Sequence, residues 1–259
     1  MIEKNERVLV VGMARSGIAA AKLLMQRGAV PLLNDQKKAD AFGDALNGFI
    51  NTNCEFHLGE NPVSLLSSCD LVVISPGVPI DAPVVRHARK LGVPLIGELE
   101  LAYSCLKGRL IAVTGTNGKT TTVSLLGQLF QNAGYTAHVG GNIGYPLCAI
   151  AMVSREEDIV VAEVSSFQLE TVQAFHPHAA ALLNVTEDHL NRHHTMEAYA
   201  ALKQRIFEFQ TEDDLAVVND DDPVVRDCAA EVLADEGYVV MQAAGGSAGI
   251  EQALRSPPD

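Results

Sequence analysis

Aromatic side chains are scarce in this sequence: they make up 5% of its 259 residues, and none of them is Trp. Hydrophobic residues nevertheless account for 47% of the chain, so its cores must consist mainly of Val, Ile, Leu and Ala. That composition is typical of parallel sheets covered by helices and disfavours an all-β fold. The length predicts two domains, each large enough to bury its own core.

Basic residues are also few. The sequence has 19 Lys and Arg but 32 Asp and Glu, which gives a formal charge of -13. Such a balance disfavours a nucleic-acid partner. The five Cys are odd in number and form no C-x-x-C pair, which indicates reduced thiols. The first apolar run stops at Gly12, too early for a signal peptide, and no run is long enough for a membrane span. We therefore expect a cytoplasmic protein without a membrane or nucleic-acid partner. We also expect a monomer, although none of these features bears on the oligomeric state.

Short apolar runs rich in β-branched residues alternate with stretches of helical spacing. In the first part, strands are predicted at residues 8–11, 30–33, 71–74 and 94–96, with helices at 16–27 and 82–91. In the second part, strands are predicted at residues 110–113, 159–163, 179–185, 215–218 and 239–241. The alternation predicts an α/β protein with a Rossmann-like parallel-sheet domain at residues 1–107 and an α/β second domain at 108–259.

A glycine-rich segment connects the strand at 110–113 to a predicted helix at 121–133. Backbone amides of such a loop surround phosphate oxygens, a following Lys reaches the terminal phosphates, and a following Thr hydroxyl can bind Mg²⁺. Because Val113 replaces the first Gly of the general pattern, the loop is a variant. An ordinary glycine-rich turn with a surface lysine is the alternative. We predict a P-loop NTPase-like domain whose ATP-binding residues are Gly115, Thr116, Asn117, Gly118, Lys119, Thr120 and Thr121.

Polar residues follow two strands of the second domain. Glu163 ends one strand and is a candidate Mg²⁺ ligand beside the loop, although a lone acid at this place is more often a solvated rim residue. His189 follows the next strand and can bind a metal; its spacing to His193 also permits a zinc pair, which no third ligand supports. Lys203 lies in a predicted helix at 196–209, where a lone lysine is usually solvated.

A second glycine pattern opens the first domain. The segment from Gly12 to Gly17 follows a strand and opens a helix, and Asp35 lies eighteen residues after Gly17, so the segment is similar to a dinucleotide fingerprint. Ala14 replaces the middle glycine and would crowd an NAD pyrophosphate. NAD binding and a merely structural tight turn both remain alternatives at this point.

Four segments together resemble the Mur ligases of peptidoglycan synthesis. They are the loop at 114–120, Gly-Gly-Asn-Ile-Gly at 140–144, Glu-Val-Ser-Ser-Phe-Gln-Leu-Glu at 163–170 and Asn-Val-Thr-Glu-Asp-His at 184–189. The amino-acid sequences of the last two segments most resemble the branch of the family that adds D-glutamate to UDP-N-acetylmuramoyl-L-alanine. The similarity extends from the first strand to about Asp222.

The resemblance implies roles that composition does not show. Lys119 and Asn142 act on the transferred phosphoryl group; Thr120 and Glu163 hold one Mg²⁺, and His189 with a Lys203 carbamylated by CO₂ holds a second. The residues implied to hold the UDP-sugar are Gly12, Ser16, Gly17, Asp35, Ser75, Pro76 and Gly77. The implied reaction is ATP-dependent formation of an amide bond through an acyl phosphate.

The family has a third domain that binds the incoming amino acid, and this chain ends before such a domain could begin. We therefore expect the chain to bind the UDP-sugar, and ATP weakly, but not to ligate by itself. The alternatives are another Mur ligase, a folylpolyglutamate-type ligase, a P-loop kinase or NTPase, and a non-catalytic nucleotide-binding module.

Overall fold

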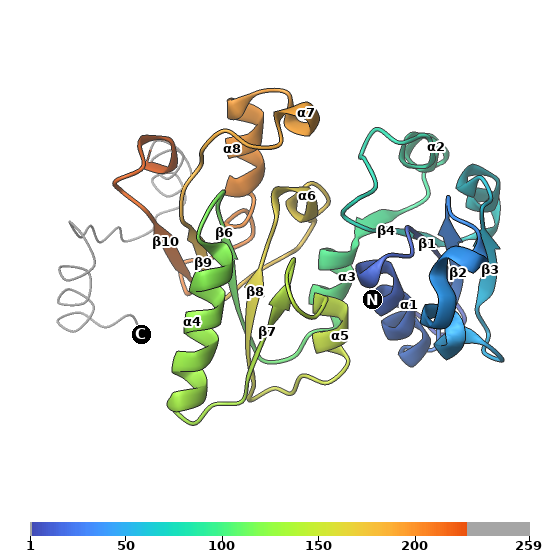
Figure 1. Ribbon diagram of the computed structural model, residues 1–259, viewed down its shortest axis with the longest axis horizontal. Coiled ribbons are helices and arrows are strands. Elements are labelled where there is room, and N and C mark those ends of the chain that lie inside the picture. Colours follow the sequence, from blue (N-terminus) through green and yellow to red (C-terminus); the bar gives the residue numbers. More distant parts are fainter. Residues whose placement is uncertain (1, 227–259) are drawn as a thin grey trace. The chain divides into compact units, whose positions relative to one another are not determined.

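The computed structural model describes residues 2–226, which form two compact units (Figure 1). The first unit consists of Met1–Gly108 with two later stretches, Gly140–Glu156 and Glu170–Ala174. The second consists of Arg109–Val139, Glu157–Leu169 and the described residues from Phe175 to Arg226. Each unit thus draws on several stretches of the sequence, and the domain boundary at residues 107 and 108 stays a prediction.

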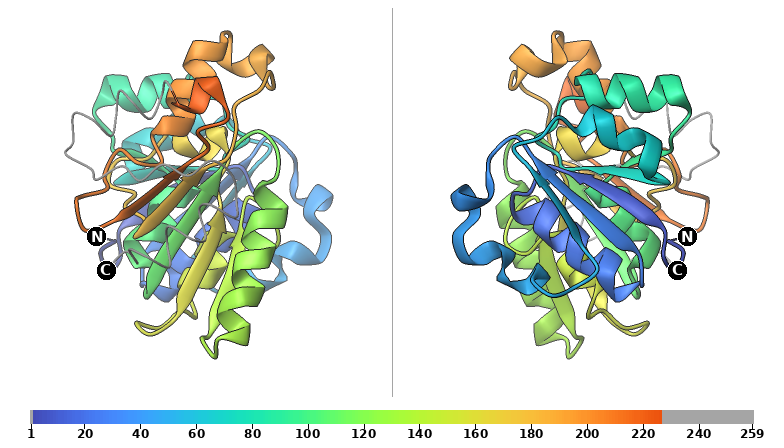
Figure 2. Two further views of the ribbon diagram at one scale, coloured as in Figure 1. Left: turned by 90° about the vertical axis from the view of Figure 1, so that its left-hand side faces the viewer. Right: turned by 90° about the vertical axis from the view of Figure 1, so that its right-hand side faces the viewer.

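The first unit is built on a five-stranded parallel sheet with the order β3-β2-β1-β4-β5 (Figure 2, right). Its strands are β1 (Arg7–Val11), β2 (Val30–Asp35), β3 (Glu55–Leu58), β4 (Leu71–Ile74) and β5 (Leu95–Gly97). Its helices are α1 (Arg15–Gln26), α2 (Pro83–Leu91), α3 (Glu98–Cys105), α5 (Leu147–Ala151) and the 3-10 segments η1 (Ala39–Phe49) and η2 (Pro62–Ser68). Val11 pairs in register with Asn34 and Ile74, so the carboxyl ends of three strands meet at one edge.

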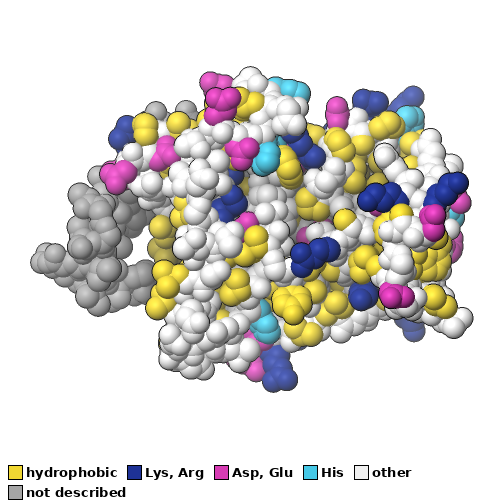
Figure 3. Space-filling model, in the orientation of Figure 1, with side chains coloured by type: hydrophobic (Ala, Val, Ile, Leu, Met, Phe, Trp, Pro, Cys, Tyr) yellow, Lys and Arg dark blue, Asp and Glu magenta, His cyan; other side chains and the backbone are white. Residues whose placement is uncertain are grey.

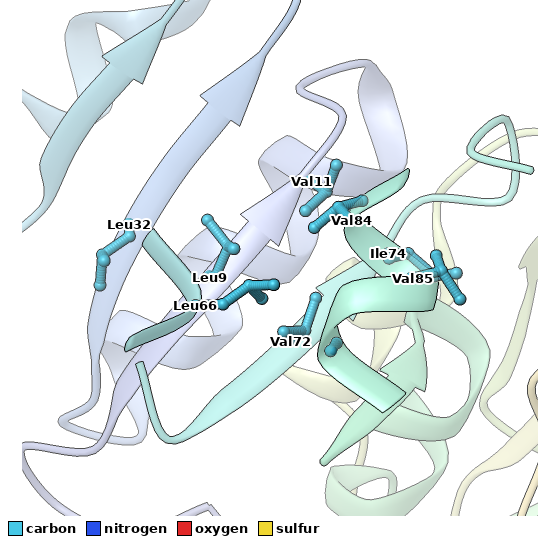
Figure 4. Close-up of a cluster of buried hydrophobic side chains, with 9 residues drawn as sticks. Leu9, Val11, Leu32, Leu66, Val72, Ile74, Val84 and Val85 are labelled. Carbon is cyan, nitrogen blue, oxygen red and sulfur yellow. The ribbon is translucent and has the colours of Figure 1, made fainter. Parts of the chain in front are cut away.

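Aliphatic side chains form the core on one face of this sheet (Figure 4). Alternate residues of the central strands point to this face because successive side chains of a strand alternate. The buried residues come from β1, β2, β4, η2 and α2: Leu9, Val11, Leu32, Leu66, Val72, Ile74, Val84, Val85 and Ala88. Val8 and Val10 are buried as well, so β1 has apolar contacts on both faces, as a central parallel strand requires.

The second unit has a five-stranded sheet with the order β10-β9-β6-β8-β7 (Figure 2, left). Its strands are β6 (Arg109–Thr114), β7 (Ala137–Gly141), β8 (Ile159–Glu163), β9 (Ala179–Leu182) and β10 (Leu215–Val218). Its helices are α4 (Lys119–Asn132), α6 (Ser166–Leu169), α7 (Leu190–His193) and α8 (Met196–Gln204). The central strand β6 pairs in parallel with β8 and β9, which places their carboxyl ends beside the start of α4.

The two parallel-sheet units confirm the predicted α/β fold class. The predicted strands within residues 2–226 are present, but β3 and β7 were not predicted. The strand expected at 179–185 ends at Leu182, and the helix expected at 196–209 ends at Gln204. The strand expected at 239–241 lies outside the described residues.

On the face shown in Figure 3, acidic, basic and hydrophobic side chains are interspersed. Within residues 2–226, no helix is both long and apolar enough to cross a membrane.

Candidate functional site

The predicted strand, loop and helix of the phosphate loop are present in the second unit. β6 ends at Thr114 and α4 begins at Lys119. Two glycines between them have positive φ angles, 147° at Gly115 and 83° at Gly118, which favour residues without a Cβ. The first turn of a helix has no intrahelical acceptor for its N–H groups, so the start of α4 offers donors to an anion.

Two lysines converge on this loop. Lys119 Nζ donates to the carbonyl oxygens of Gly115 and Thr116, at 2.8 and 2.7 Å. Lys203 Nζ donates to the Gly115 oxygen at 2.8 Å. Burial, reinforced by the nearby charge of Lys119, lowers the pKa of Lys203 to about 7. The Lys203 side chain is 1% exposed, so its interpretation as an ordinary solvated lysine is wrong.

A buried aromatic residue supports Lys203. The Lys203 Nζ lies 4.6 Å from the centroid of the Tyr199 ring, a cation–π distance. The Tyr199 hydroxyl lies 3.3 Å from the Thr116 hydroxyl of the loop, and the His193 ring stacks on Tyr199 with centroids 5.2 Å apart. In the sequence, Tyr199 served only as a landmark for Lys203, and no contact was predicted for it. The signal was its position four residues before Lys203, which puts both on one helix face.

Oxygen atoms suited to Mg²⁺ meet beside the loop. The Thr120 hydroxyl donates to the Glu163 carboxylate at 2.7 Å, and Glu163 is 2% exposed. A hydroxyl and a carboxylate are ligands that Mg²⁺ prefers, so this pair fits the predicted ion. Because Glu163 is buried against Thr120, it is not a solvated rim residue.

His189 occupies the start of α7 in a left-handed conformation with φ of 53°. Its side chain is 48% exposed, and its Nε2 lies 3.4 Å from Asp188. His193, the other histidine of the possible zinc pair, is buried with Nε2 3.0 Å from the Ser166 hydroxyl. Among the residues that the structure describes, no group of three or more His, Cys, Asp and Glu is arranged to hold a metal. The predicted ligand set, which relies on a hydroxyl and a carbamate, stays a prediction.

In the first unit, the glycine pattern of residues 12–17 contacts Ser75, which directly follows β4. Gly12 has φ of 91°, and its carbonyl oxygen accepts a hydrogen bond from the Ser75 hydroxyl at 2.7 Å. A Cβ on Gly17 would overlap the same oxygen. The Asp35 carboxylate accepts from the Met13 amide at 2.7 Å. The turn after β1 is therefore fixed from both β2 and β4.

The remaining predicted substrate residues lie around this turn. Ser16 is half-buried in the first turn of α1, and Pro76 and Gly77 directly follow Ser75. Asn142 belongs to the first unit and is exposed. Arg15, at the start of α1, donates to the carbonyl oxygen of Gly144. The structure thus groups Asn142 with the predicted UDP-sugar residues, whereas Lys119 belongs to the second unit.

Comparisons with known proteins match both parts of the chain to one family. Residues 113–253 match the family described as "Mur ligase middle domain", and residues 6–97 match "Mur ligase MurD-like, N-terminal domain". A protein of Alkaliphilus oremlandii named UDP-N-acetylmuramoylalanine–D-glutamate ligase is 44% identical over 237 residues, which are 91% of this chain and 52% of that protein. A protein of the same name from a Thermoanaerobacter species is 46% identical over 85% of this chain and 49% of its own length. The chain spans about half the length of these curated relatives.

Solved structures show the same fold at lower identity. The UDP-N-acetylmuramate:L-alanyl-γ-D-glutamyl-meso-diaminopimelate ligase of Neisseria meningitides aligns with a TM-score of 0.59 and 19% identity, over 87% of this chain and 75% of that one. The UDP-N-acetylmuramate–alanine ligase of Thermotoga maritima aligns with a TM-score of 0.52 and 20% identity, over 86% of this chain and 51% of that one.

Proposed function

The chain belongs to the Mur ligase family, and from this premise we propose that it carries the nucleotide and sugar-nucleotide sites of an ATP-dependent ligase. The reaction that we propose joins D-glutamate to UDP-N-acetylmuramoyl-L-alanine. The names of relatives at 43–46% identity support this choice of substrates. The observation that carries the proposal is the phosphate loop with two lysines on one carbonyl oxygen and a Thr120–Glu163 pair beside it.

In the second unit, we assign ATP to the loop between β6 and α4. The N–H groups at the start of α4 bind phosphate oxygens, and Lys119 turns from the Gly115 and Thr116 oxygens to the terminal phosphates. Thr120 and Glu163 would hold a Mg²⁺ ion, which would offset negative charge on the phosphoryl group. The 2.7 Å contact between these two residues supports the assignment.

We assign a second metal to His189 and a carbamylated Lys203. An amine must be neutral to attack CO₂, and a pKa of about 7 leaves a substantial neutral fraction of Lys203 near neutral pH. The carbamate would turn a buried cation into an anionic oxygen ligand. Burial of Lys203 and its contact with the Tyr199 ring support this role.

In the first unit, we assign the UDP-sugar to the edge where β1, β2 and β4 end. The turn from Gly12 to Gly17 offers the amides at the start of α1 to the diphosphate. Asp35 would bind the uracil, and the segment after Ser75 would contact the phosphate region of the sugar nucleotide. The hydrogen bond from Ser75 to Gly12 and that from the Met13 amide to Asp35 support one continuous binding edge.

The proposed chemistry has two steps. The terminal carboxylate of the L-alanyl substrate attacks the γ-phosphorus of ATP, which releases ADP and leaves an acyl phosphate. The amine of D-glutamate then attacks the acyl carbon, phosphate leaves with the bonding electron pair, and the amine loses a proton. No protein nucleophile is needed, so the role of the site is to position the reactants and stabilise charge.

Calorimetric titration of the chain tests the proposal. We expect UDP-N-acetylmuramoyl-L-alanine to bind more tightly than UDP-N-acetylmuramate, and MgATP to bind at a separate site. Binding of NAD in place of the UDP-sugar would overturn the assignment of the first unit. ATP hydrolysis that needs neither the sugar nucleotide nor D-glutamate would instead favour a P-loop NTPase.

A further inference from the structure

We propose that Asn184 is a positioning residue: its side-chain amide fixes the shape of the phosphate loop. Its Oδ1 accepts hydrogen bonds from the amides of Thr116 and Asn117, at 3.1 and 2.8 Å. Its Nδ2 donates to the carbonyl oxygen of Asn117 at 3.0 Å. One side chain therefore binds both backbone polar groups of Asn117, and it shares the Thr116 amide with the Asn184 main-chain carbonyl oxygen, which accepts from that amide at 2.9 Å.

The loop needs such a support because of its glycines. Thr116 and Asn117 lie between Gly115 and Gly118, whose positive φ angles mark two positions of high backbone freedom. Ordering such a segment costs conformational entropy. By binding the two residues between the glycines, Asn184 removes that freedom before a ligand arrives, which is preorganisation.

The same contacts divide the loop amides into two groups. Asn184 accepts from the amides of Thr116 and Asn117, so these two point towards residue 184. The amides at the start of α4 have no intrahelical acceptor and stay available to phosphate oxygens. Asn184 thus determines which face of the loop is offered to the nucleotide, although it is not itself assigned a phosphate contact.

The register of the sheet explains why the phosphate loop after β6 lies beside the segment after β9. β6 and β9 pair in parallel with Thr114 opposite Leu182, so the chain after each strand emerges at the same edge. Beyond Asn184, the Thr186 amide donates to the Thr116 hydroxyl at 3.0 Å, and that hydroxyl lies 3.1 Å from the Thr186 carbonyl oxygen. Residues 184–186 therefore run alongside the loop: Asn184 binds the Asn117 backbone, and the Thr186 hydroxyl accepts from the Asn117 side-chain amide at 3.4 Å.

The Oδ1 acceptor and the Nδ2 donor of Asn184 together form what we call the clamp on Thr116 and Asn117. The substitution Asn184→Asp separates the donor from the acceptor. It keeps the size and the acceptor oxygens, loses the donor to the Asn117 carbonyl oxygen, and restores that donor only when the introduced carboxyl is protonated. This inference rests on the proposed ATP site, so the ligand to titrate is MgATP. At pH 8 we expect MgATP affinity to fall by about tenfold, because the hydrogen bond from Asn184 Nδ2 to the Asn117 carbonyl oxygen is replaced by repulsion between two oxygens. The difference in MgATP affinity between Asn184→Asp and wild type should become smaller as the pH falls to 5, because protonation of the introduced carboxyl restores the donor.

A matched control is Asn219→Asp. The side chain of Asn219, which follows β10, donates to the Leu183 carbonyl oxygen at 3.0 Å, so the same chemical change occurs at a hydrogen bond to Leu183 rather than to the phosphate loop. We expect it to leave MgATP affinity unchanged. Equal affinities of Asn184→Asp and wild type for MgATP, or a pH-independent deficit, would overturn the proposal.

Hydrogen exchange of the unliganded wild-type chain gives a second readout that needs no variant. The Asn117 amide should be protected, because Asn184 Oδ1 accepts its proton. Rapid exchange at Asn117 would show that the clamp does not exist, whatever ATP does. If Asn117 is protected but wild-type chain does not bind MgATP, the proposed ATP site fails and the clamp remains as a structural finding.

Discussion

Lys119 and Lys203 donate hydrogen bonds to the same oxygen atom, the carbonyl of Gly115, each at 2.8 Å. Two ammonium groups on one acceptor repel each other, and this repulsion adds to burial in lowering the pKa of Lys203 to about 7. The arrangement couples the loop lysine to the buried lysine. A ligand that draws Lys119 away from Gly115 would therefore also relieve the repulsion on Lys203.

The first prediction concerns Lys119 itself. Replacing Lys119 by Met removes a charge that the phosphates of ATP would contact, and MgATP affinity should fall by roughly 10- to 100-fold, the range for one hydrogen bond to a charged group. Calorimetry measures this. Lys90→Met is the control, because Lys90 is an exposed lysine of α2 in the other unit. An unchanged affinity in Lys119→Met would remove the loop from the proposed ATP site.

The second prediction concerns a carbamate on Lys203. At pH 8 an amine with a pKa of about 7 is largely neutral, whereas an ordinary lysine is almost wholly charged. We expect ¹³C NMR of the chain in ¹³C-bicarbonate to show a carbamate signal that grows as the pH rises through about 7. The signal should be missing from Lys203→Gln. A signal of equal size in that variant would assign the carbamate to another amine.

Much of the fold could be predicted from local pattern. The apolar, β-branched runs of β1, β4, β6 and β8 are buried on both faces, so their composition alone distinguishes them from helices and loops. β3 and β7 lack that signal. Glu55–Leu58 alternates polar and apolar residues at a sheet edge, and Ala137–Gly141 ends in two glycines, so both depend on pairing with a neighbouring strand rather than on their own sequence.

Some features of the candidate site could likewise be predicted from the sequence, and others could not. The loop residues could be predicted because they follow β6, and Glu163 because it is the last residue of β8; the carboxyl ends of parallel strands meet at one edge. The partners of Lys203 and the role of Asn184 could not, because these contacts join residues about 70 to 90 positions apart in sequence. Spacing shows that Tyr199 and Lys203 share a helix face, but not that this face is buried beneath the loop.

The third prediction concerns the buried acid of α3. Glu98 is 1% exposed; its Oε1 accepts from the Cys148 amide at 3.0 Å, and its Oε2 has no partner among the described residues. Burial raises the pKa of Glu98 above its ordinary 4.5. The folded chain then binds a proton that the unfolded chain releases, so this contribution to stability is present below pH 4.5 and is lost as the pH rises through the folded pKa.

Glu98→Gln tests this sign, because it keeps the acceptor for Cys148 and removes the titration. Urea unfolding at pH 5 and pH 8 should show wild type losing stability relative to the variant at the higher pH. Glu156→Gln is the control, since the Glu156 side chain is 77% exposed and should shift stability little at either pH. A difference between wild type and Glu98→Gln that does not change with pH would mean that Glu98 is already ionised in the folded chain.

The last prediction concerns Gly17, where α1 meets the turn after β1. A Cβ at this position would overlap the carbonyl oxygen of Gly12, which is backbone and is held by the Ser75 hydroxyl. Gly17→Ala must therefore shift the helix or open the turn, at a cost of about 1–3 kcal/mol, as for other overpacked sites. Because the turn is the proposed diphosphate site, binding of UDP-N-acetylmuramoyl-L-alanine should weaken as well.

Gly48→Ala provides the comparison, because its added Cβ would meet only the Lys22 side chain, at an ordinary contact distance of 3.6 Å. It should unfold like wild type and bind the sugar nucleotide equally well. In Gly17→Ala, MgATP affinity should be retained, since the phosphate loop belongs to the other unit. Loss of sugar-nucleotide binding with intact ATP binding would localise the effect to the β1–α1 turn. Unchanged sugar-nucleotide binding in a destabilised Gly17→Ala chain would instead make this turn structural and move the diphosphate elsewhere.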